Sequence, residues 1–209
     1  MLLVSNFSGQ NSVSGIRKIT QDEKELYSYC DLSDVDNMIL SHSSLARRLE
    51  ILNVRALIKE LGLNIRIQYK ERKPICDEGF ISISHSDELA GIIWSRETEY
   101  SLDIEKISSR MLRISNRAFS VEEHTFAGAD LRKLTILWNC KECVYKLANN
   151  KGIDFKKQIQ VLPFNENDKI MCDYFYDTNR KRTYVFDYKQ ILDHTYVWGK
   201  QIISNDTKR

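Results

Sequence analysis

The chain has 209 residues, which is enough for one large domain or two small ones with a sizeable core. Its composition is 42% hydrophobic and 29% charged with only two prolines, which excludes a disordered or low-complexity protein. The net charge of +2 lacks the strong basic excess of a nucleic-acid binder, and no apolar stretch approaches the roughly 20 residues that span a bilayer. We therefore expect a cytoplasmic protein without nucleic-acid or membrane partners.

The cysteines and the N-terminus fit this expectation. Five cysteines is an odd number, and only Cys140 and Cys143 are closely spaced. Neither a second C-x-x-C pair nor a nearby histidine completes a zinc site, so reduced thiols are predicted. Residues 1–10 are too polar for the apolar core of a signal peptide.

The first half of the chain predicts one long helix followed by strands. Apolar residues recur at helical spacing over 45–61, and Gly62 follows as a C-cap. A turn is expected around Pro74, between two of the predicted strands. Three segments alternate like strands: 64–70, 79–86 and 89–95.

The second half predicts a mixture of the same kind. Ser120 followed by Glu123 three residues later forms a capping box, which predicts that a helix begins there. The other expected elements are a strand at 99–107, helices at 111–119 and 134–147, and two antiparallel strands within 182–202.

This order of elements predicts an α+β protein with two halves. The N-terminal α+β half is residues 1–97, and the C-terminal α+β half is residues 98–209. Since no linker rich in glycine, proline or serine separates them, we expect them to pack as one body. Pockets favour such interfaces.

The segment YSLDIEKI places two carboxylates in a β-prone stretch. Strand alternation sends Leu102 and Ile104 to one face and Asp103 and Glu105 to the other. A surface strand that faces water is one interpretation, because exposed acids are common. The other is a Mg²⁺ site, because Mg²⁺ binds through one or two carboxylates together with water and substrate phosphates.

A helix in the second half provides further charged groups. Its predicted apolar face consists of Leu137, Cys140, Val144 and Leu147, and its opposite face of Trp138, Lys141, Glu142, Tyr145 and Lys146. Glu142 and Lys146 have the spacing of a surface i,i+4 ion pair. Alternatively, Glu142 is a third carboxylate for the metal, beside two lysines directed at phosphate.

The segment ISISHS ends a predicted strand at His85. A histidine there is commonly a structural hydrogen-bonding group, and a general base would need a partner that the sequence does not reveal. The G-x-S-x-G turn of a serine hydrolase is absent from the sequence.

Three motifs follow one another in order: SHS at 84–86, DIEK at 103–106 and W-x-x-KE-x-x-x-K at 138–146. With these motifs the chain resembles the 4′-phosphopantetheinyl transferases, in particular the long, pseudo-dimeric, surfactin-synthetase-activating type. The match runs from about residue 47 to residue 155. The resemblance implies an α+β fold of two similar α/β halves packed as a pseudo-dimer, with the active site at the seam.

The resemblance also implies an activity. Such enzymes transfer the phosphopantetheine arm of coenzyme A to a serine of an apo acyl or peptidyl carrier protein and release adenosine 3′,5′-bisphosphate. Mg²⁺ is the cofactor and coenzyme A is the co-substrate. The carrier belongs to fatty-acid, polyketide or nonribosomal peptide biosynthesis. A monomer is expected, because the two halves already form the site.

The resemblance assigns the metal and the catalytic groups. Mg²⁺ is assigned to Asp103, Glu105 and Glu142, and a phosphate contact to Lys146. The proton of the carrier serine goes to Glu142 or to Glu123 of the F-S-x-x-E stretch, and the residues alone do not choose between them. Lys146 is also expected to donate to the departing phosphate.

The resemblance assigns the nucleotide end of coenzyme A to the first half. Lys73 of the K-P turn is expected to bind the nucleotide, and Ser84 and His85 to hold the region of the 3′-phosphate. Arg47 or Arg48 of the early helix is expected to contact the same phosphate.

The chain departs from the family pattern at three glycines. Arg72 and Ser101 replace the glycines before K-P and before DIE, and Asn149 or Asn150 stands where a glycine turn follows the last lysine. Asparagine tolerates the left-handed conformation, so the helix can still end there.

Other interpretations remain open. One is a non-catalytic relative that binds coenzyme A or a carrier protein, and another is a Mg²⁺-dependent phosphoesterase that uses the same acids. The basic, apolar segment 110–119 is expected to recognise the carrier, or else to be an ordinary amphipathic helix.

Overall fold

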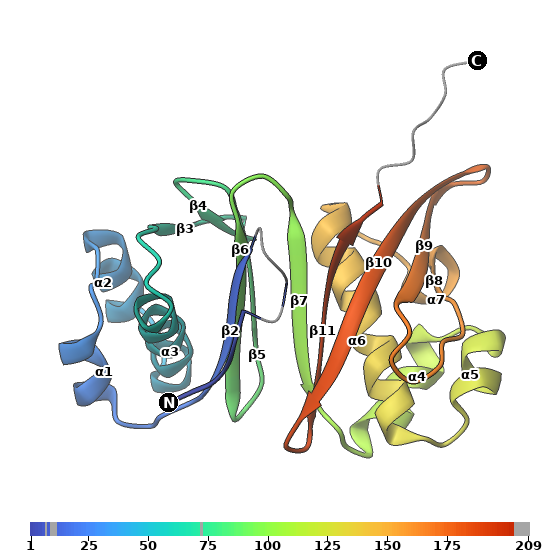
Figure 1. Ribbon diagram of the computed structural model, residues 1–209, viewed down its shortest axis with the longest axis horizontal. Helices are drawn as coiled ribbons and strands as arrows, with labels where there is room; N and C mark the ends of the chain where they lie inside the picture. Colours follow the sequence, from blue (N-terminus) through green and yellow to red (C-terminus); the bar gives the residue numbers. More distant parts are fainter. Residues whose placement is uncertain (7, 9–11, 72, 203–209) are drawn as a thin grey trace. The chain divides into compact units, whose positions relative to one another are not determined.

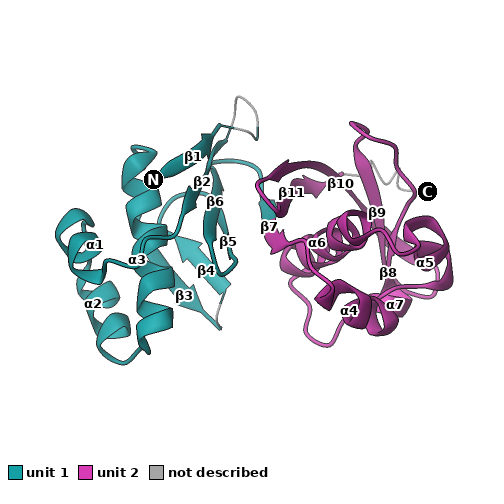
Figure 2. Ribbon diagram, turned by 90° about the horizontal axis from the view of Figure 1, so that it is seen from below, with its two compact units in different colours: residues 1–102 teal, residues 103–209 magenta. Residues whose placement is uncertain are grey.

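The computed structural model describes residues 1–6, 8, 12–71 and 73–202 (Figure 1). The expected departure at Arg72 therefore lies outside the described residues. The chain divides into two compact units, Met1–Leu102 and Asp103–Arg209, which Figure 2 shows in different colours. Each unit combines helices with antiparallel sheet, so the predicted α+β class is confirmed.

The first unit contains a four-stranded antiparallel sheet in the order β1-β2-β6-β5 and a separate hairpin, β3-β4. Its strands are β1 (Leu2–Ser5), β2 (Val13–Lys18), β3 (Ile67–Lys70), β4 (Lys73–Cys76), β5 (Phe80–His85) and β6 (Leu89–Ser95). Its helices are α1 (Glu23–Tyr29), α2 (Asp34–Ser41) and α3 (Leu45–Glu60). Figure 1 shows these helices on one side of the sheet.

Helix α3 confirms the long helix predicted from the apolar periodicity. It begins after Ser44, whose side chain accepts a hydrogen bond from the Arg47 amide, and it ends where Gly62 adopts a φ of 65°. Its buried face includes Leu52 and Leu57. Contacts with β2 and β6 hold this helix against the sheet of the first unit.

The turn predicted at Pro74 is wrong. Pro74 lies within β4, where it faces Tyr69, and the hairpin closes between Lys70 and Lys73. Glu71 follows β3 with a φ of 49°. A two-stranded sheet consists of edge strands only, and an edge strand tolerates the missing N–H of proline.

The second unit contains a five-stranded antiparallel sheet in the order β7-β11-β10-β9-β8. Its strands are β7 (Tyr100–Lys106), β8 (Ile159–Val161), β9 (Ile170–Asp177), β10 (Arg180–Ile191) and β11 (His194–Gln201). Its helices are α4 (Arg110–Ala118), α5 (Val121–Ala127), α6 (Leu131–Ala148) and α7 (Phe155–Gln158). Strand β7 begins in the last residues of the first unit.

Helix α6 forms the centre of the second unit, where it contacts β11, β8 and the helices α4 and α5. It begins after Asp130, which caps two backbone amides, and it ends at Asn149 in the left-handed conformation, with a φ of 53°. The helix therefore ends at an asparagine, as expected of a residue that tolerates the left-handed conformation. The capping box predicted at Ser120 and Glu123 is confirmed at the start of α5.

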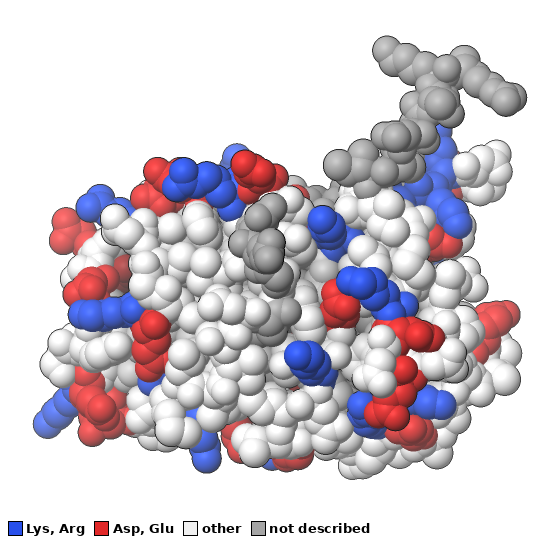
Figure 3. Space-filling model, in the orientation of Figure 1, with Lys and Arg blue, Asp and Glu red and all other residues white. Residues whose placement is uncertain are grey.

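The five cysteines are free thiols. Cys30 is buried in the first unit, three more are buried in the second unit, and Cys76 is half-buried. Within the described part of the chain, no helix is both long and apolar enough to cross a membrane. On the face shown in Figure 3, described Lys and Arg side chains alternate with Asp and Glu, and no wide area carries a single charge.

Candidate active site

The acidic strand β7 is buried on both of its faces. Leu102 and Ile104 are enclosed, and Asp103 on the other face is only 6% exposed. The interpretation of a solvated surface strand is therefore wrong. A buried carboxylate is costly unless a charged partner compensates it. The Nζ atom of Lys146, from α6, lies 2.8 Å from Asp103 Oδ1 and provides that compensation.

Glu105 is the second carboxylate of the strand, and it is half-buried. The indole N–H of Trp138 donates a hydrogen bond of 3.1 Å to its Oε1 atom. Burial raises the pKa of Glu105, and the negative charge of Asp103 raises it further. The hydrogen bond from Trp138 and the charges of Arg110 and Lys146 act in the opposite direction.

Glu142 on α6 has the most altered acidity of the three. Burial and the charge of Asp103 raise the pKa of Glu142 to about 7, with a further contribution from Glu105 and an opposing one from Lys146. The charges of Asp103 and Lys146 therefore change the pKa values of both Glu105 and Glu142. We call this set, Asp103, Glu105, Glu142 and Lys146, the acidic cluster.

The acidic cluster has the chemistry that a hard divalent cation requires. Carboxylate oxygens are the preferred protein ligands of Mg²⁺, and a cation would offset the repulsion that raises the pKa values of Glu105 and Glu142. In the part of the chain that the structure describes, however, no three His, Cys, Asp or Glu side chains are grouped closely enough to hold a metal ion. Binding of an ion by all three carboxylates would thus require at least one of them to turn toward the others.

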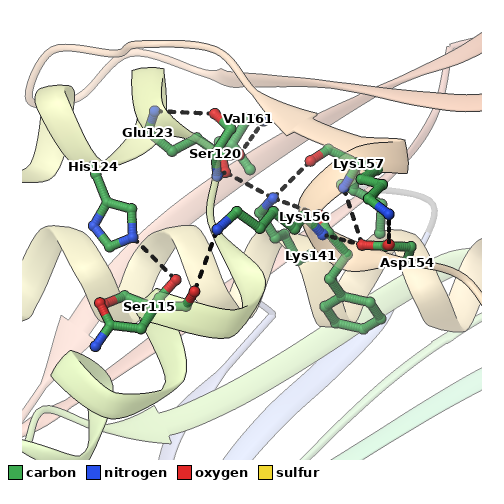
Figure 4. Close-up of polar contacts among 12 residues, drawn as sticks. Ser115, Ser120, Glu123, His124, Lys141, Asp154, Lys156, Lys157 and Val161 are labelled. Carbon is green, nitrogen blue, oxygen red and sulfur yellow. Dashed lines mark hydrogen bonds and ion pairs between the residues drawn. The ribbon is translucent and has the colours of Figure 1, made fainter.

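Lys141 does not belong to this site. The prediction that it faces phosphate is wrong, because its side chain is 0% exposed and lies in the interior. Its ammonium group forms an ion pair of 2.8 Å with Glu123 (Figure 4). It also donates to the backbone oxygens of Phe155 and Ile159. These three acceptors match the three N–H bonds of a lysine. Burial lowers the pKa of Lys141, and the charge of Glu123 opposes that effect.

Glu123 is equally engaged in the interior. One of its oxygens accepts the backbone N–H of Val161 and the other accepts the backbone N–H of Ser120, both at 2.8 Å. Together with the ion pair to Lys141, these bonds connect α5, α6 and β8 (Figure 4). A carboxylate with both oxygens engaged in a buried network is poorly placed to exchange protons with a substrate.

The first unit contains a pocket of about 160 Å³. Its lining residues come from α3, β3, β4 and β5: Arg47, Glu50, Ile51, Val54, Tyr69, Pro74, Ile83 and His85. Two residues predicted to contact coenzyme A, Arg47 and His85, therefore meet here. Both contact Glu50, at 2.8 Å and 3.4 Å respectively.

The other predicted contacts with coenzyme A are placed differently. Arg48, the alternative to Arg47, does not line this pocket and instead forms an ion pair with Glu23 and donates to the backbone oxygen of Ser43. Lys73 forms an ion pair of 2.9 Å with Glu99, and Ser84 is buried in β5. Of the two arginines, Arg47 therefore lines the pocket, while Arg48 is engaged elsewhere.

Sequence reasoning missed two residues of this pocket. Glu50 is three positions after Arg47 on the same helix, a spacing that could have indicated the ion pair. Tyr69 lies beneath the Arg47 guanidinium, 6.0 Å from the ring centroid. Tyr69 lines the pocket because β3 pairs with β4 in a hairpin. The sequence prediction did not include this hairpin, because it placed a turn where β4 lies.

A second pocket, of about 280 Å³, lies in the second unit. It is mainly apolar, and its lining residues are Ile114, Arg117, Ala118, Trp138 and Phe155. The predicted carrier-recognition segment forms α4, whose Leu112 and Arg113 side chains are exposed. Trp138 belongs both to this pocket and to the hydrogen bond with Glu105.

No family model matches this chain, and no curated protein matches it either.

Proposed function

We propose that this chain is a 4′-phosphopantetheinyl transferase. It transfers the phosphopantetheine arm of coenzyme A to a serine of an apo acyl or peptidyl carrier protein, with Mg²⁺ as cofactor. The observation that carries the proposal is the acidic cluster, in which three carboxylates and one lysine interact at the adjoining parts of β7 and α6. The proposal includes a monomeric, cytoplasmic enzyme.

In this proposal Asp103, Glu105 and Glu142 hold the metal. The bound ion would neutralise the pyrophosphate of coenzyme A and orient it for in-line attack. Burial and mutual repulsion raise the pKa values of Glu105 and Glu142, so a cation would stabilise their charged forms. Lys146 adds a positive charge for the departing phosphate.

The serine oxygen attacks the phosphorus atom next to the pantetheine arm, and the bond to the adenylate phosphate breaks. The serine proton needs an acceptor near the reacting phosphate. We assign this role to Glu142, which belongs to the acidic cluster, rather than to Glu123, whose oxygens are engaged in the interior.

The proposal places the nucleotide end of coenzyme A on the first unit. Arg47 and His85 line one pocket and provide cationic and hydrogen-bonding groups for a 3′-phosphate, and Tyr69 offers a ring for the adenine. Since coenzyme A would then use residues of both units, the proposal includes a pseudo-dimer with its active site at the seam.

The test is intact-mass spectrometry of an apo carrier protein incubated with this protein, coenzyme A and Mg²⁺. We expect a gain equal to one phosphopantetheine arm, and none with an Asp103→Ala variant. Several carriers from fatty-acid, polyketide and peptide pathways should be compared. If none gains mass although coenzyme A binds, a non-catalytic relative is favoured. If coenzyme A is hydrolysed without any acceptor, a phosphoesterase is favoured.

A further inference from the structure

Trp138 connects two features of the second unit. It lies on α6, where its indole ring lines the apolar pocket and packs against Phe155 with 5.5 Å between the ring centroids. Its N–H donates a hydrogen bond of 3.1 Å to Glu105 Oε1. Packing of the ring therefore fixes the direction in which the N–H points.

This hydrogen bond constrains a side chain that would otherwise have several rotamers. Glutamate has rotatable bonds that cost free energy to order, and a ligand that is already oriented loses less entropy when an ion binds. An indole N–H is a donor only, so it binds one carboxylate oxygen and competes neither for protons nor for a cation. The second oxygen, Oε2, remains for another ligand.

We propose that Trp138 is a positioning residue that holds Glu105 in the orientation needed to bind a divalent cation. This inference rests on the metal site of the proposed function. It assigns to the tryptophan of the W-x-x-KE motif a role through its N–H, separate from the packing role of its ring. Loss of an outer hydrogen bond of this kind weakens metal binding by about 10- to 100-fold.

The test measures Mn²⁺ affinity by electron paramagnetic resonance, without coenzyme A or carrier. Trp138→Phe retains an aromatic ring and removes the N–H, so we expect affinity to fall by at least about tenfold. The matched control is Trp94→Phe in β6. That residue also donates its indole N–H, but to the backbone oxygen of Glu78, so Mn²⁺ affinity should not change. Equal affinity in wild type and Trp138→Phe would overturn the inference.

A second variant separates the N–H from the shape of the ring. Benzothienylalanine at position 138 replaces the indole nitrogen with sulfur and keeps the size of the ring system. It should weaken Mn²⁺ binding as much as Trp138→Phe while leaving the melting temperature unchanged. Unchanged affinity in this variant would overturn the inference even if Trp138→Phe failed to fold.

The outcomes for the inference and for the proposed function are distinguishable. If the wild-type protein binds Mn²⁺ but transfers nothing to any carrier, the transferase proposal fails while the positioning test still decides the role of Trp138. If the wild-type protein binds no Mn²⁺, the metal site and the inference both fail.

Discussion

The two units share part of their order of elements. In each, one strand directly precedes a run of helices, and the last strand of the unit pairs with that strand: β6 pairs with β2, and β11 pairs with β7. The third helix, α3 in one unit and α6 in the other, contacts the returning strand. The two helices can therefore be compared position by position.

The buried ion pairs match closely. Arg55, the eleventh residue of α3, pairs with Asp36 at the N3 position of α2. Lys141, the eleventh residue of α6, pairs with Glu123 at the N3 position of α5. In both units the acidic partner also forms a capping box. One carboxylate therefore caps the start of its own helix and forms an ion pair with the next helix.

The acidic cluster is where the units differ. The twelfth residue is buried Ala56 in α3 and Glu142 in α6. The sixteenth is Glu60, paired with Arg17 of β2, against Lys146, paired with Asp103 of β7. The fold thus accepts an alanine where the second unit has a carboxylate with a pKa of about 7. The comparison teaches that a carboxylate at the position of Glu142 is not needed to build this architecture, which supports a functional role for Glu142.

The largest expected effect is a difference in transfer rate between alanine variants of Asp103 and of Arg17. Under the proposed function, Asp103→Ala should lower the rate of phosphopantetheine transfer by at least about 10³-fold, because it removes a proposed ligand of the metal at the reacting phosphates. Arg17→Ala, its counterpart in the first unit, should leave the rate within about threefold. Time courses of intact carrier mass provide both numbers. Equal losses in the two variants would contradict the assignment of the metal to the acidic residues of the second unit.

The next effect tests whether the matched ion pairs are equivalent. Lys141→Ala and Arg55→Ala should each lower the free energy of unfolding by about 3–5 kcal/mol, since each leaves a buried carboxylate without its partner. Urea denaturation measures the loss. Lys157→Ala is the control, because Lys157 is largely exposed and its replacement should cost under about 0.5 kcal/mol. A small loss for Lys141→Ala would show that the pair is dispensable.

A smaller effect concerns the pH dependence of stability. The pKa of Glu142 is raised to about 7 in the folded protein, so its folded state favours the proton. The protonated Glu142 side chain therefore contributes to the free energy of unfolding. This contribution is complete below the pKa that Glu142 has in the unfolded chain, and it is lost as the pH rises through about 7. In EDTA at pH 8, Glu142→Gln should therefore be more stable than wild type by about 2 kcal/mol, with little difference at pH 4.

Urea denaturation at both pH values measures this difference. The alanine at the matching position of α3 predicts the same direction for Glu142→Ala. A Glu142→Gln variant that is destabilised equally at pH 4 and pH 8 would contradict the raised pKa.

The smallest effect concerns recognition of the carrier. Charge reversal at Arg113, exposed on α4, should raise the KM for an acidic carrier by about three- to tenfold and leave the KM for coenzyme A unchanged. Lys24→Glu on α1 is the matched change in the first unit and should alter neither constant. Steady-state kinetics with both substrates decide. An unchanged KM for the carrier would contradict the prediction that α4 recognises the carrier.

Much of the fold could be predicted because its signals are local. The strand at 89–95 matches β6 from end to end, and the capping box at Ser120 marks the start of α5. The turn at Pro74 failed because proline signals a turn or an edge strand equally well, and only the pairing with β3 distinguishes them.

The residue types of the candidate site could be predicted from the sequence, but the burial of their side chains could not. The helical wheel placed Lys141 on a polar face, because a wheel assumes that one side of a helix is solvated. Helix α6 is instead covered by the sheet on one side and by α4 and α5 on others, so Lys141 is buried. The pairing of Lys141 with Glu123 joins residues 18 positions apart on different helices, which periodicity does not report.

The buried thiols allow the unfolding of each unit to be measured separately. Cys30 lies in the core of the first unit, and Cys140, Cys143 and Cys172 lie in the core of the second. A thiol reagent can reach them only when the surrounding core opens, so pulse labelling followed by peptide mass analysis would time the two events separately in the unmodified protein. Simultaneous labelling would mean that the two units unfold cooperatively. Sequential labelling would show which unit unfolds more slowly.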